Sequence, residues 1–158
     1  MPTEIERKFL VTGEGWRQSA LGPARRLRQG YLASGGGAAP VVRVRLSDDD
    51  GYLTVKGPGL LSRAEYEYPI PAAHALAMLG DLCPPPVIEK TRTRVAHAGM
   101  VWEVDEFAGH LAGLVIAEIE LEAADQPFAR PDWVGTEVTG DRRYQNSTLS
   151  RALAPPFD

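Results

Sequence analysis

Near the N-terminus the sequence reads Glu4-Ile5-Glu6-Arg7-Lys8, and this stretch decides how the chain is interpreted. Side chains of a β-strand point alternately to opposite faces, so a strand over residues 3–11 places both glutamates and the lysine on one face. The apolar residues of the stretch then share the other face. This alternation predicts a strand with one charged face and one apolar face.

The same two-residue alternation recurs along most of the chain, and turn signals separate the repeats. Glycines 35–37, the run Asp48-Asp49-Asp50-Gly51 and the pair Ala98-Gly99 are typical of hairpin connections. We predict strands over residues 3–11, 25–34, 41–48, 51–57, 62–70, 87–97, 100–108 and 115–123.

Helical spacing over residues 71–82 predicts one clear helix, with Pro71 at its start, where proline is tolerated. Shorter helices are expected near residues 13–18, 110–114, 131–134 and 141–153. No internal repeat and no low-complexity linker divides the chain, so residues 1–158 are predicted to form a single domain.

Both signs of charge appear in patterned blocks on the polar faces, with two or three cations or carboxylates to a strand and few neutral polar residues among them. A single strand of this kind is explained most simply by a solvated face of an antiparallel sheet. Over seven strands that explanation weakens, and a closed sheet with its charges around one axis becomes the alternative. Aromatic residues on the opposite parity are then expected to form a core under the helices: Phe9, Tyr66, Tyr68 and Trp102.

Composition bounds the function. The chain has 158 residues and a formal net charge of −4, which argues against a nucleic-acid polymer as the main partner. The single cysteine, Cys83, cannot form an internal disulfide. No apolar run approaches the roughly 18 residues that span a bilayer, and the N-terminus is charged where a signal peptide is apolar. We therefore expect no membrane association and a cytoplasmic protein; a homodimer stays open.

The gathered charges suit a polyphosphate ligand. Arginine forks match phosphate oxygens in bidentate geometry, and lysines act as point charges. Clustered carboxylates without histidine or cysteine ligands fit Mg²⁺ or Mn²⁺ better than Zn²⁺ or copper. Phosphoryl transfer depends mainly on positioning and electrostatics, so it needs no serine nucleophile. The proton of the attacking water could be handled by Lys90 or by a hydroxide on the metal.

The N-terminal stretch resembles the ExExK signature of the CYTH superfamily, the triphosphate tunnel metalloenzymes. Further matches run in order along the chain, from about residue 3 to residue 148. They are Gln29-Gly30-Tyr31, Arg43-Val44-Arg45, Thr54-Val55-Lys56, Arg63-Ala64-Glu65-Tyr66-Glu67, Lys90-Thr91-Arg92, Glu103-Val104-Asp105-Glu106-Phe107, Glu118-Ile119-Glu120-Leu121-Glu122 and Glu137-Val138-Thr139-Gly140-Asp141.

The resemblance implies a mainly β (α+β) fold, an eight-stranded antiparallel closed tunnel barrel with a charged interior and helices packed outside. It implies triphosphate binding by Lys8, Arg43, Arg45, Lys56, Lys90 and Arg92. Metal binding falls to Glu4, Glu6, Asp105, Glu118 and Glu120, with Glu65, Glu67, Glu103 and Glu122 as further inward carboxylates. Lys90, Glu6 and Tyr31 are the expected catalytic residues, although Tyr31 could instead line the wall with a structural hydrogen bond.

The short bacterial members that this chain resembles act on inorganic tripolyphosphate, which makes a metal-dependent triphosphatase the leading expectation, with nucleoside triphosphates as possible further substrates. Two alternatives remain open. One is a class IV type adenylyl cyclase that converts ATP into cyclic AMP and pyrophosphate. The other is a binding module for polyphosphate or nucleotide without turnover.

Overall fold

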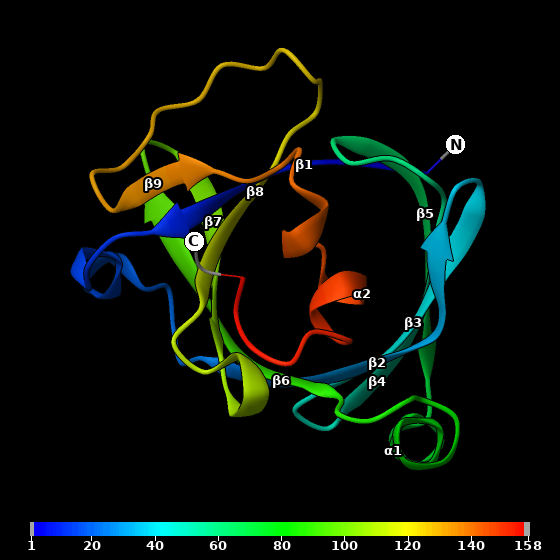
Figure 1. The fold of residues 1–158 in the computed structure, drawn as a ribbon. Coiled ribbons are helices and arrows are strands. Elements are labelled where there is room, and N and C mark those ends of the chain that lie inside the picture. The colour runs from blue at the N-terminus through cyan, green and yellow to red at the C-terminus, as the bar shows by residue number, and fades with distance from the viewer. Residues whose placement is uncertain (1, 157–158) are drawn as a thin grey trace.

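The computed structural model describes residues 2–156, in which one antiparallel sheet closes into a ring (Figure 1). The hydrogen-bonded order is β5-β4-β3-β2-β6-β7-β8-β1, and β1 pairs back onto β5. A further strand, β9, extends the sheet from β1. The strands are β1 (Thr3–Val11), β2 (Arg25–Gly36), β3 (Ala39–Ser47), β4 (Asp50–Lys56), β5 (Ser62–Ile70), β6 (Ile88–His97), β7 (Met100–Phe107), β8 (Val115–Glu120) and β9 (Val134–Glu137).

The eight predicted strands and the closed antiparallel ring are confirmed, with small shifts at most strand ends. The predicted strand over 115–123 ends earlier, at Glu120. The short helix expected over 131–134 is absent: residues 131–133 form a turn, and β9 begins at Val134. The main helix, α1 (Ala72–Asp81), lies where its spacing placed it. Short 3-10 helices occupy η1 (Gly15–Ser19), η2 (Gly109–Leu111) and η3 (Arg142–Tyr144), and the last helix is α2 (Asn146–Leu149). No helix in the described part of the chain is long and apolar enough to cross a membrane.

One hydrophobic core lies outside the ring, behind β1, β7 and β8. Phe9 and Trp102 are fully buried there and meet edge to face, with ring centroids 5.6 Å apart. Phe128 and Trp133 pack on Trp102 from the irregular segment after β8. Trp16 of η1 completes the cluster. The expectation of helices over these aromatic residues is therefore wrong in one respect: loop residues supply most of the cover.

α1 covers another part of the outer surface, over β3 and β4 and close to β2. Ala75 and Leu79 of α1 are buried with Val44 and Cys83. Gly30 allows this approach, because a Cβ there would lie 2.7 Å from the Cys83 Cβ.

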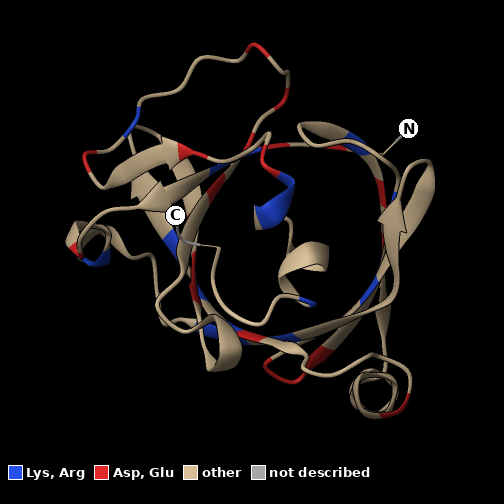
Figure 2. Cartoon of the chain, viewed as in Figure 1, with Lys and Arg blue, Asp and Glu red and all other residues tan. Residues whose placement is uncertain are grey.

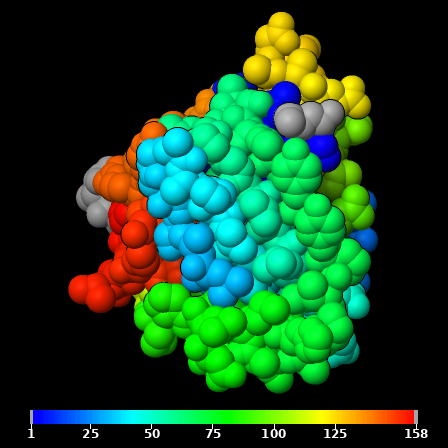
Figure 3. Space-filling model, turned by 90° about the vertical axis from the view of Figure 1, so that its right-hand side faces the viewer, coloured from blue at the N-terminus to red at the C-terminus, as the bar shows by residue number. Residues whose placement is uncertain are grey.

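The outer surface of β5 is left largely uncovered. Figure 3 shows α1 at the base of the face that β3, β4 and β5 form, below rather than across the upper strands. The Tyr68 residue is 55% exposed and Tyr66 is half-buried. The prediction that both tyrosines belong to a covered core is wrong for Tyr68, because its position on β5 lies beyond the reach of α1.

One end of the ring is apolar inside and closed by the C-terminal segment, residues 138–152. Inward positions at this apolar end carry Leu10, Ile88, Phe107 and Ile116, which pack against Tyr144 and Leu149. Figure 1 shows η3 and α2 within the outline of the ring. The helix expected over 141–153 on the outside is instead two short helices across this end.

Candidate active site

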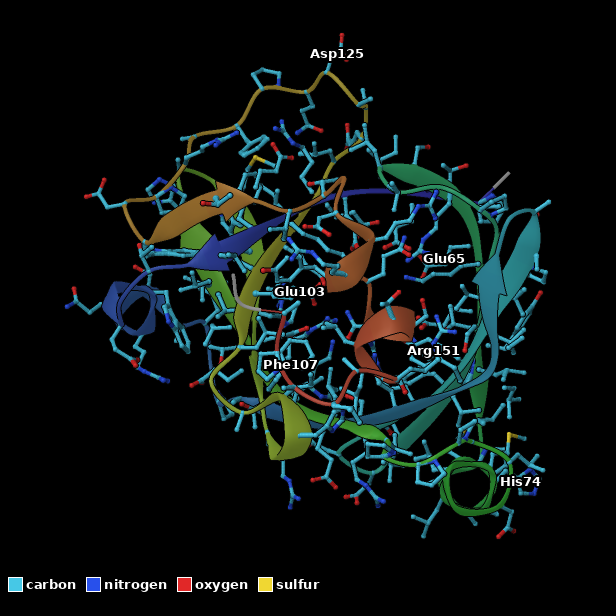
Figure 4. The ribbon with its side chains drawn as sticks, in the orientation of Figure 1. Glu65, His74, Glu103, Phe107, Asp125 and Arg151 are labelled. Atoms are coloured by element: carbon cyan, nitrogen blue, oxygen red, sulfur yellow. The ribbon has the colours of Figure 1, made fainter. Side chains whose placement is uncertain are left out.

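A central cavity of about 460 Å³ lies inside the ring, next to the apolar end, and charged side chains line it. Acidic and basic segments follow one another around the ring in Figure 2, and Glu65 and Glu103 point into it from β5 and β7 in Figure 4. By contrast, His74 and Asp125 lie outside the ring (Figure 4). Among the described lining residues are seven cations, namely Lys8, Arg43, Arg45, Lys56, Arg63, Lys90 and Arg92, and seven carboxylates, namely Glu4, Glu6, Glu65, Glu67, Glu103, Glu118 and Glu120.

Asp105 is the most deeply placed charge of the site. It has no solvent exposure, and one oxygen lies 2.7 Å from Lys90 Nζ. Arg92 donates to both of its oxygens, at 2.8 and 2.9 Å. Burial alone would raise the pKa of this carboxyl, but Arg92 and Lys90 hold the pKa of Asp105 well below its ordinary value. Asp105 is thus ionised at neutral pH and anchors the side chains of Lys90 and Arg92.

Burial has the opposite effect on the pKa of Lys90, which is 3% exposed. It lowers the pKa of the Lys90 ammonium to about 7, against the attraction of Asp105 and with the repulsion of Arg92 and Arg45. The Lys90 Nζ also lies 5.2 Å from the centre of the Phe107 ring, at the border of the apolar end. A lysine in this setting is partly neutral at physiological pH, which is the state needed to accept a proton.

Carboxylates hold the remaining cations apart. Lys56 Nζ lies 2.8 Å from Glu4, Arg43 lies 3.5 Å from Glu67, and Lys8 lies 3.8 Å from Glu6. Burial lowers the pKa of Lys56, and the positive charge of Arg43 adds to the effect. The contacts of Arg43 and Lys8 are longer than an ordinary hydrogen bond, so these two cations are held only loosely by their carboxylates.

A row of amides links the ring wall to the C-terminal segment. Arg45 Nε donates to Gln29 Oε1 at 2.9 Å, and Gln29 Nε2 donates to Tyr31 Oη and to Asn146 Oδ1, each at 3.1 Å. Asn146 Oδ1 also accepts from Lys90 Nζ at 2.9 Å. Burial, followed by repulsion from Arg43 and Arg92, lowers the pKa of Arg45 to about 9, so its guanidinium stays charged at neutral pH.

Several of the carboxylates that line the cavity lie close enough to repel one another. Burial, and then the charges of Glu4, Glu6 and Glu103, raise the pKa of Glu120. Hard divalent cations prefer carboxylate oxygens and would relieve this repulsion, so the residues present fit a metal of that class. Within residues 2–156, however, no three such side chains converge as a ready-made metal site. Binding of a metal would require the glutamates to adjust.

Comparisons with known proteins identify the family to which this architecture belongs. The CYTH domain model matches residues 2–153. The chain belongs to the CYTH family. Two curated CYTH-like relatives carry the name inorganic triphosphatase. One, from Acetivibrio thermocellus, is 51% identical over 94% of each chain. The other, from Nitrosomonas europaea, is 39% identical over 96% of this chain and 99% of its own length.

A crystal structure described as that of an inorganic triphosphatase superimposes with a TM-score of 0.68. It is 36% identical in sequence and covers 98% of both chains. The resemblance expected from the sequence is therefore confirmed across nearly the whole chain, and the closed ring is the CYTH fold.

Most residues that the CYTH resemblance indicated do line the cavity, and Tyr31 lines it with its hydroxyl held by Gln29. Two indicated side chains are placed differently. Asp105 lies behind Lys90 and Arg92 in the wall, and Glu122 is exposed beyond the end of β8. Arg94, which shares the strand face of Lys90, is exposed and does not reach the cavity.

Several residues that line the cavity were given no role from the sequence. Arg63 lines the cavity, and so do Gln145, Asn146 and Ser147 of the C-terminal segment. Gln29 was part of a matched motif but had no role, although it is fully buried within the hydrogen-bonded row. One signal was available for the C-terminal residues: a polar run interrupts a segment whose neighbours, Tyr144 and Leu149, are apolar.

Proposed function

We propose that this protein hydrolyses inorganic tripolyphosphate with the help of Mg²⁺ or Mn²⁺. The observation that carries the proposal is the composition of the cavity wall, which combines seven cations with seven carboxylates in a closed ring. The names of the two curated relatives, both inorganic triphosphatases, support the same substrate.

Charge balance supports a metal requirement. The cations and carboxylates of the described wall are equal in number, so a multiply charged anion would leave the cavity with a net negative charge unless further positive charge is supplied. Two unit charges 4 Å apart interact by about 4 kcal/mol at an effective dielectric near 20, so an unbalanced anion would be costly. Divalent cations on the glutamates would supply the balance and leave the arginines free for phosphate.

The proposed roles follow from position and chemistry. Arg43, Arg45 and Arg92 present planar guanidinium groups that suit phosphate oxygens, with Lys8 and Lys56 as point charges. Glu4, Glu6, Glu118 and Glu120 are the proposed metal ligands, whereas Glu65, Glu67 and Glu103 border the cavity. We place Asp105 outside the ligand set, because its oxygens are already bonded to Lys90 and Arg92.

Lys90 is the proposed acceptor of the proton from the attacking water. Its pKa of about 7 leaves a substantial neutral fraction at physiological pH, and Lys90 is among the residues that line the cavity. The water would attack a terminal phosphorus while the arginines hold the oxygens that gain charge, and orthophosphate and pyrophosphate would result. A bound metal would add Lewis-acid stabilisation of the phosphate oxygens. Glu6 and Tyr31 would orient the reacting groups.

An adenylyl cyclase fits the wall less well. A nucleotide needs a surface for its base, and Tyr31 is the only aromatic residue among the described residues that line the cavity. Tyr31 lies at the apolar end, with its hydroxyl bonded to Gln29. A binding module without turnover has no use for a buried lysine with a lowered pKa, so hydrolysis is the favoured function.

Phosphate release from tripolyphosphate in the presence of Mg²⁺ or Mn²⁺ tests the proposal. The variants Lys90→Ala and Glu6→Gln should each lose most of the activity, while the exposed-site variant Glu122→Gln should retain it. Tight binding of tripolyphosphate without hydrolysis in either metal would favour the binding module instead. Cyclic AMP and pyrophosphate formed from ATP would favour the cyclase.

A further inference from the structure

We propose that Asn146 is a positioning residue that holds the Lys90 amino group in the orientation needed to accept a proton from the attacking water. The inference rests on the proposed function of Lys90, but its physical part, the immobilisation of one lysine by one amide, can be tested without turnover. Asn146 is the first residue of α2, and its side chain reaches into the ring to meet residues of β2 and β6.

Two hydrogen bonds fix the Lys90 nitrogen. Nζ has three tetrahedral positions besides its bond to carbon. Asp105 Oδ2 occupies one at 2.7 Å, and Asn146 Oδ1 occupies a second at 2.9 Å. The third position is thereby set in space, and Lys90 lines the cavity in which substrate is proposed to bind. Asp105 alone would leave Nζ free to rotate about one contact; Asn146 removes that freedom.

The orientation of the Asn146 amide is itself determined by the row of hydrogen bonds. A guanidinium can only donate, so Arg45 Nε requires Gln29 Oε1 as its acceptor at 2.9 Å. The Gln29 amide nitrogen then faces Asn146, which must present its oxygen at 3.1 Å. That same oxygen is the acceptor for Lys90. A charged arginine on β3 thus decides which atom of Asn146 meets the lysine.

The C-terminal segment is anchored well enough to serve this purpose. Tyr144 and Leu149, on either side of Asn146, are buried in the apolar end. The Tyr144 hydroxyl donates to the carbonyl of Pro156 at 2.9 Å. Gln29, the second partner of Asn146, has no solvent exposure. Asn146 therefore stands on a fixed support, as a positioning residue requires.

The kinetic test compares Asn146→Ala with wild type on tripolyphosphate. Misplacement of a reacting group by about 1 Å can lower a rate by about 10²-fold, so we expect kcat to fall by about tenfold to a hundredfold. KM should change little, because the phosphate-binding arginines are untouched. The matched control is Thr148→Ala on the same helix, whose side chain is not among those lining the cavity and which should keep the wild-type kcat.

The structural test uses the small number of lysines. The sequence contains only Lys8, Lys56 and Lys90, so protein labelled with ¹³C-lysine gives three sets of side-chain NMR signals. The two Hε protons of a fixed lysine have different shifts, and those of a freely rotating lysine become equal. Asn146→Ala should equalise the Lys90 pair and leave the other two lysines unchanged. Asn146→Asp, which keeps an acceptor oxygen, should preserve the Lys90 difference.

The two arms separate failure of the inference from failure of the proposed function. If no preparation hydrolyses tripolyphosphate, the proposed function is wrong, and the NMR arm alone decides the role of Asn146. If Asn146→Ala lowers kcat while all three lysine signals stay as in wild type, Asn146 does not act through Lys90. An unchanged kcat in Asn146→Ala also overturns the inference.

Discussion

Lys90 Nζ and Asp105 Oδ2 lie 2.7 Å apart at a place where the two side chains have 1% and 0% solvent exposure. Such a buried pair is costly to break, because removal of one partner leaves the other charge without water or counter-ion. Arg92 shares the same carboxylate. Asp105 therefore compensates two cations that the proposed mechanism needs in fixed positions.

Replacement of this carboxylate should destabilise the whole domain. Asp105→Asn keeps the shape of the side chain but leaves Lys90 without its counter-ion and Arg92 without its bidentate partner, so we expect a loss of about 3–5 kcal/mol. The urea midpoint of unfolding measures the change. Glu122→Gln, at an exposed position, should stay within about 0.5 kcal/mol of wild type. A midpoint for Asp105→Asn equal to that of wild type would mean that the pair contributes nothing.

The lowered pKa of Lys90 predicts how activity depends on pH. Below about 7 the amino group is protonated and cannot accept a proton; above about 7 it is neutral and can. The value of kcat should therefore rise with pH through this region and then level off. Lys90→Arg, which keeps a positive charge throughout, should be slow and lack the rise. A kcat for wild type that falls as pH increases through 7 contradicts the assignment of Lys90 as proton acceptor.

Glu120 should affect stability and metal binding in opposite directions. Its raised pKa means that the folded protein disfavours the charged form, so Glu120→Gln should raise the melting temperature in the absence of metal. The same change removes a proposed ligand and should weaken Mn²⁺ binding by at least about tenfold, the loss typical of even an outer-shell partner. Melting scans and calorimetry measure the two effects. Unchanged Mn²⁺ affinity would exclude Glu120 as a ligand.

Gly30 offers a test of how α1 is held against the ring. An added Cβ would lie 2.7 Å from the Cys83 Cβ and 2.8 Å from its Sγ, so Gly30→Ala should cost about 1–3 kcal/mol. Gly80, within α1, has no atom within 4 Å of the corresponding position. Gly80→Ala should therefore stabilise the protein by about 0.5–1 kcal/mol. Equal effects of the two substitutions on the unfolding midpoint would rule out close packing at Gly30.

The sequence predicted the parts of this structure that depend on local alternation. Alternate residues of a strand share a face, so the alternation of charged and apolar neighbours predicted that Glu6, Arg43 and Arg92 lie on one face of their strands. Closure into a ring was left open by alternation alone, and the family resemblance decided it. Register between strands then brought together charges that are far apart in the chain.

Features that depend on irregular segments were not predictable in the same way. Residues 121–133 cover Phe9 and Trp102 without any periodic pattern, and β9 has only four residues. The C-terminal segment enters the end of the ring because it buries inward apolar residues such as Phe107. This position depends on the closed sheet, so the sequence of the segment alone does not predict it. Asn146 was missed for that reason.

The central claim is that the cavity selects an inorganic triphosphate and hydrolyses it. The most direct measurement is the product analysis of one panel, in which wild-type protein with Mg²⁺ or Mn²⁺ is given tripolyphosphate, ATP, GTP or thiamine triphosphate. We predict orthophosphate and pyrophosphate from tripolyphosphate, at a kcat/KM well above that for the other three. Cyclic AMP from ATP, or no release of phosphate from tripolyphosphate with either metal, would contradict the claim.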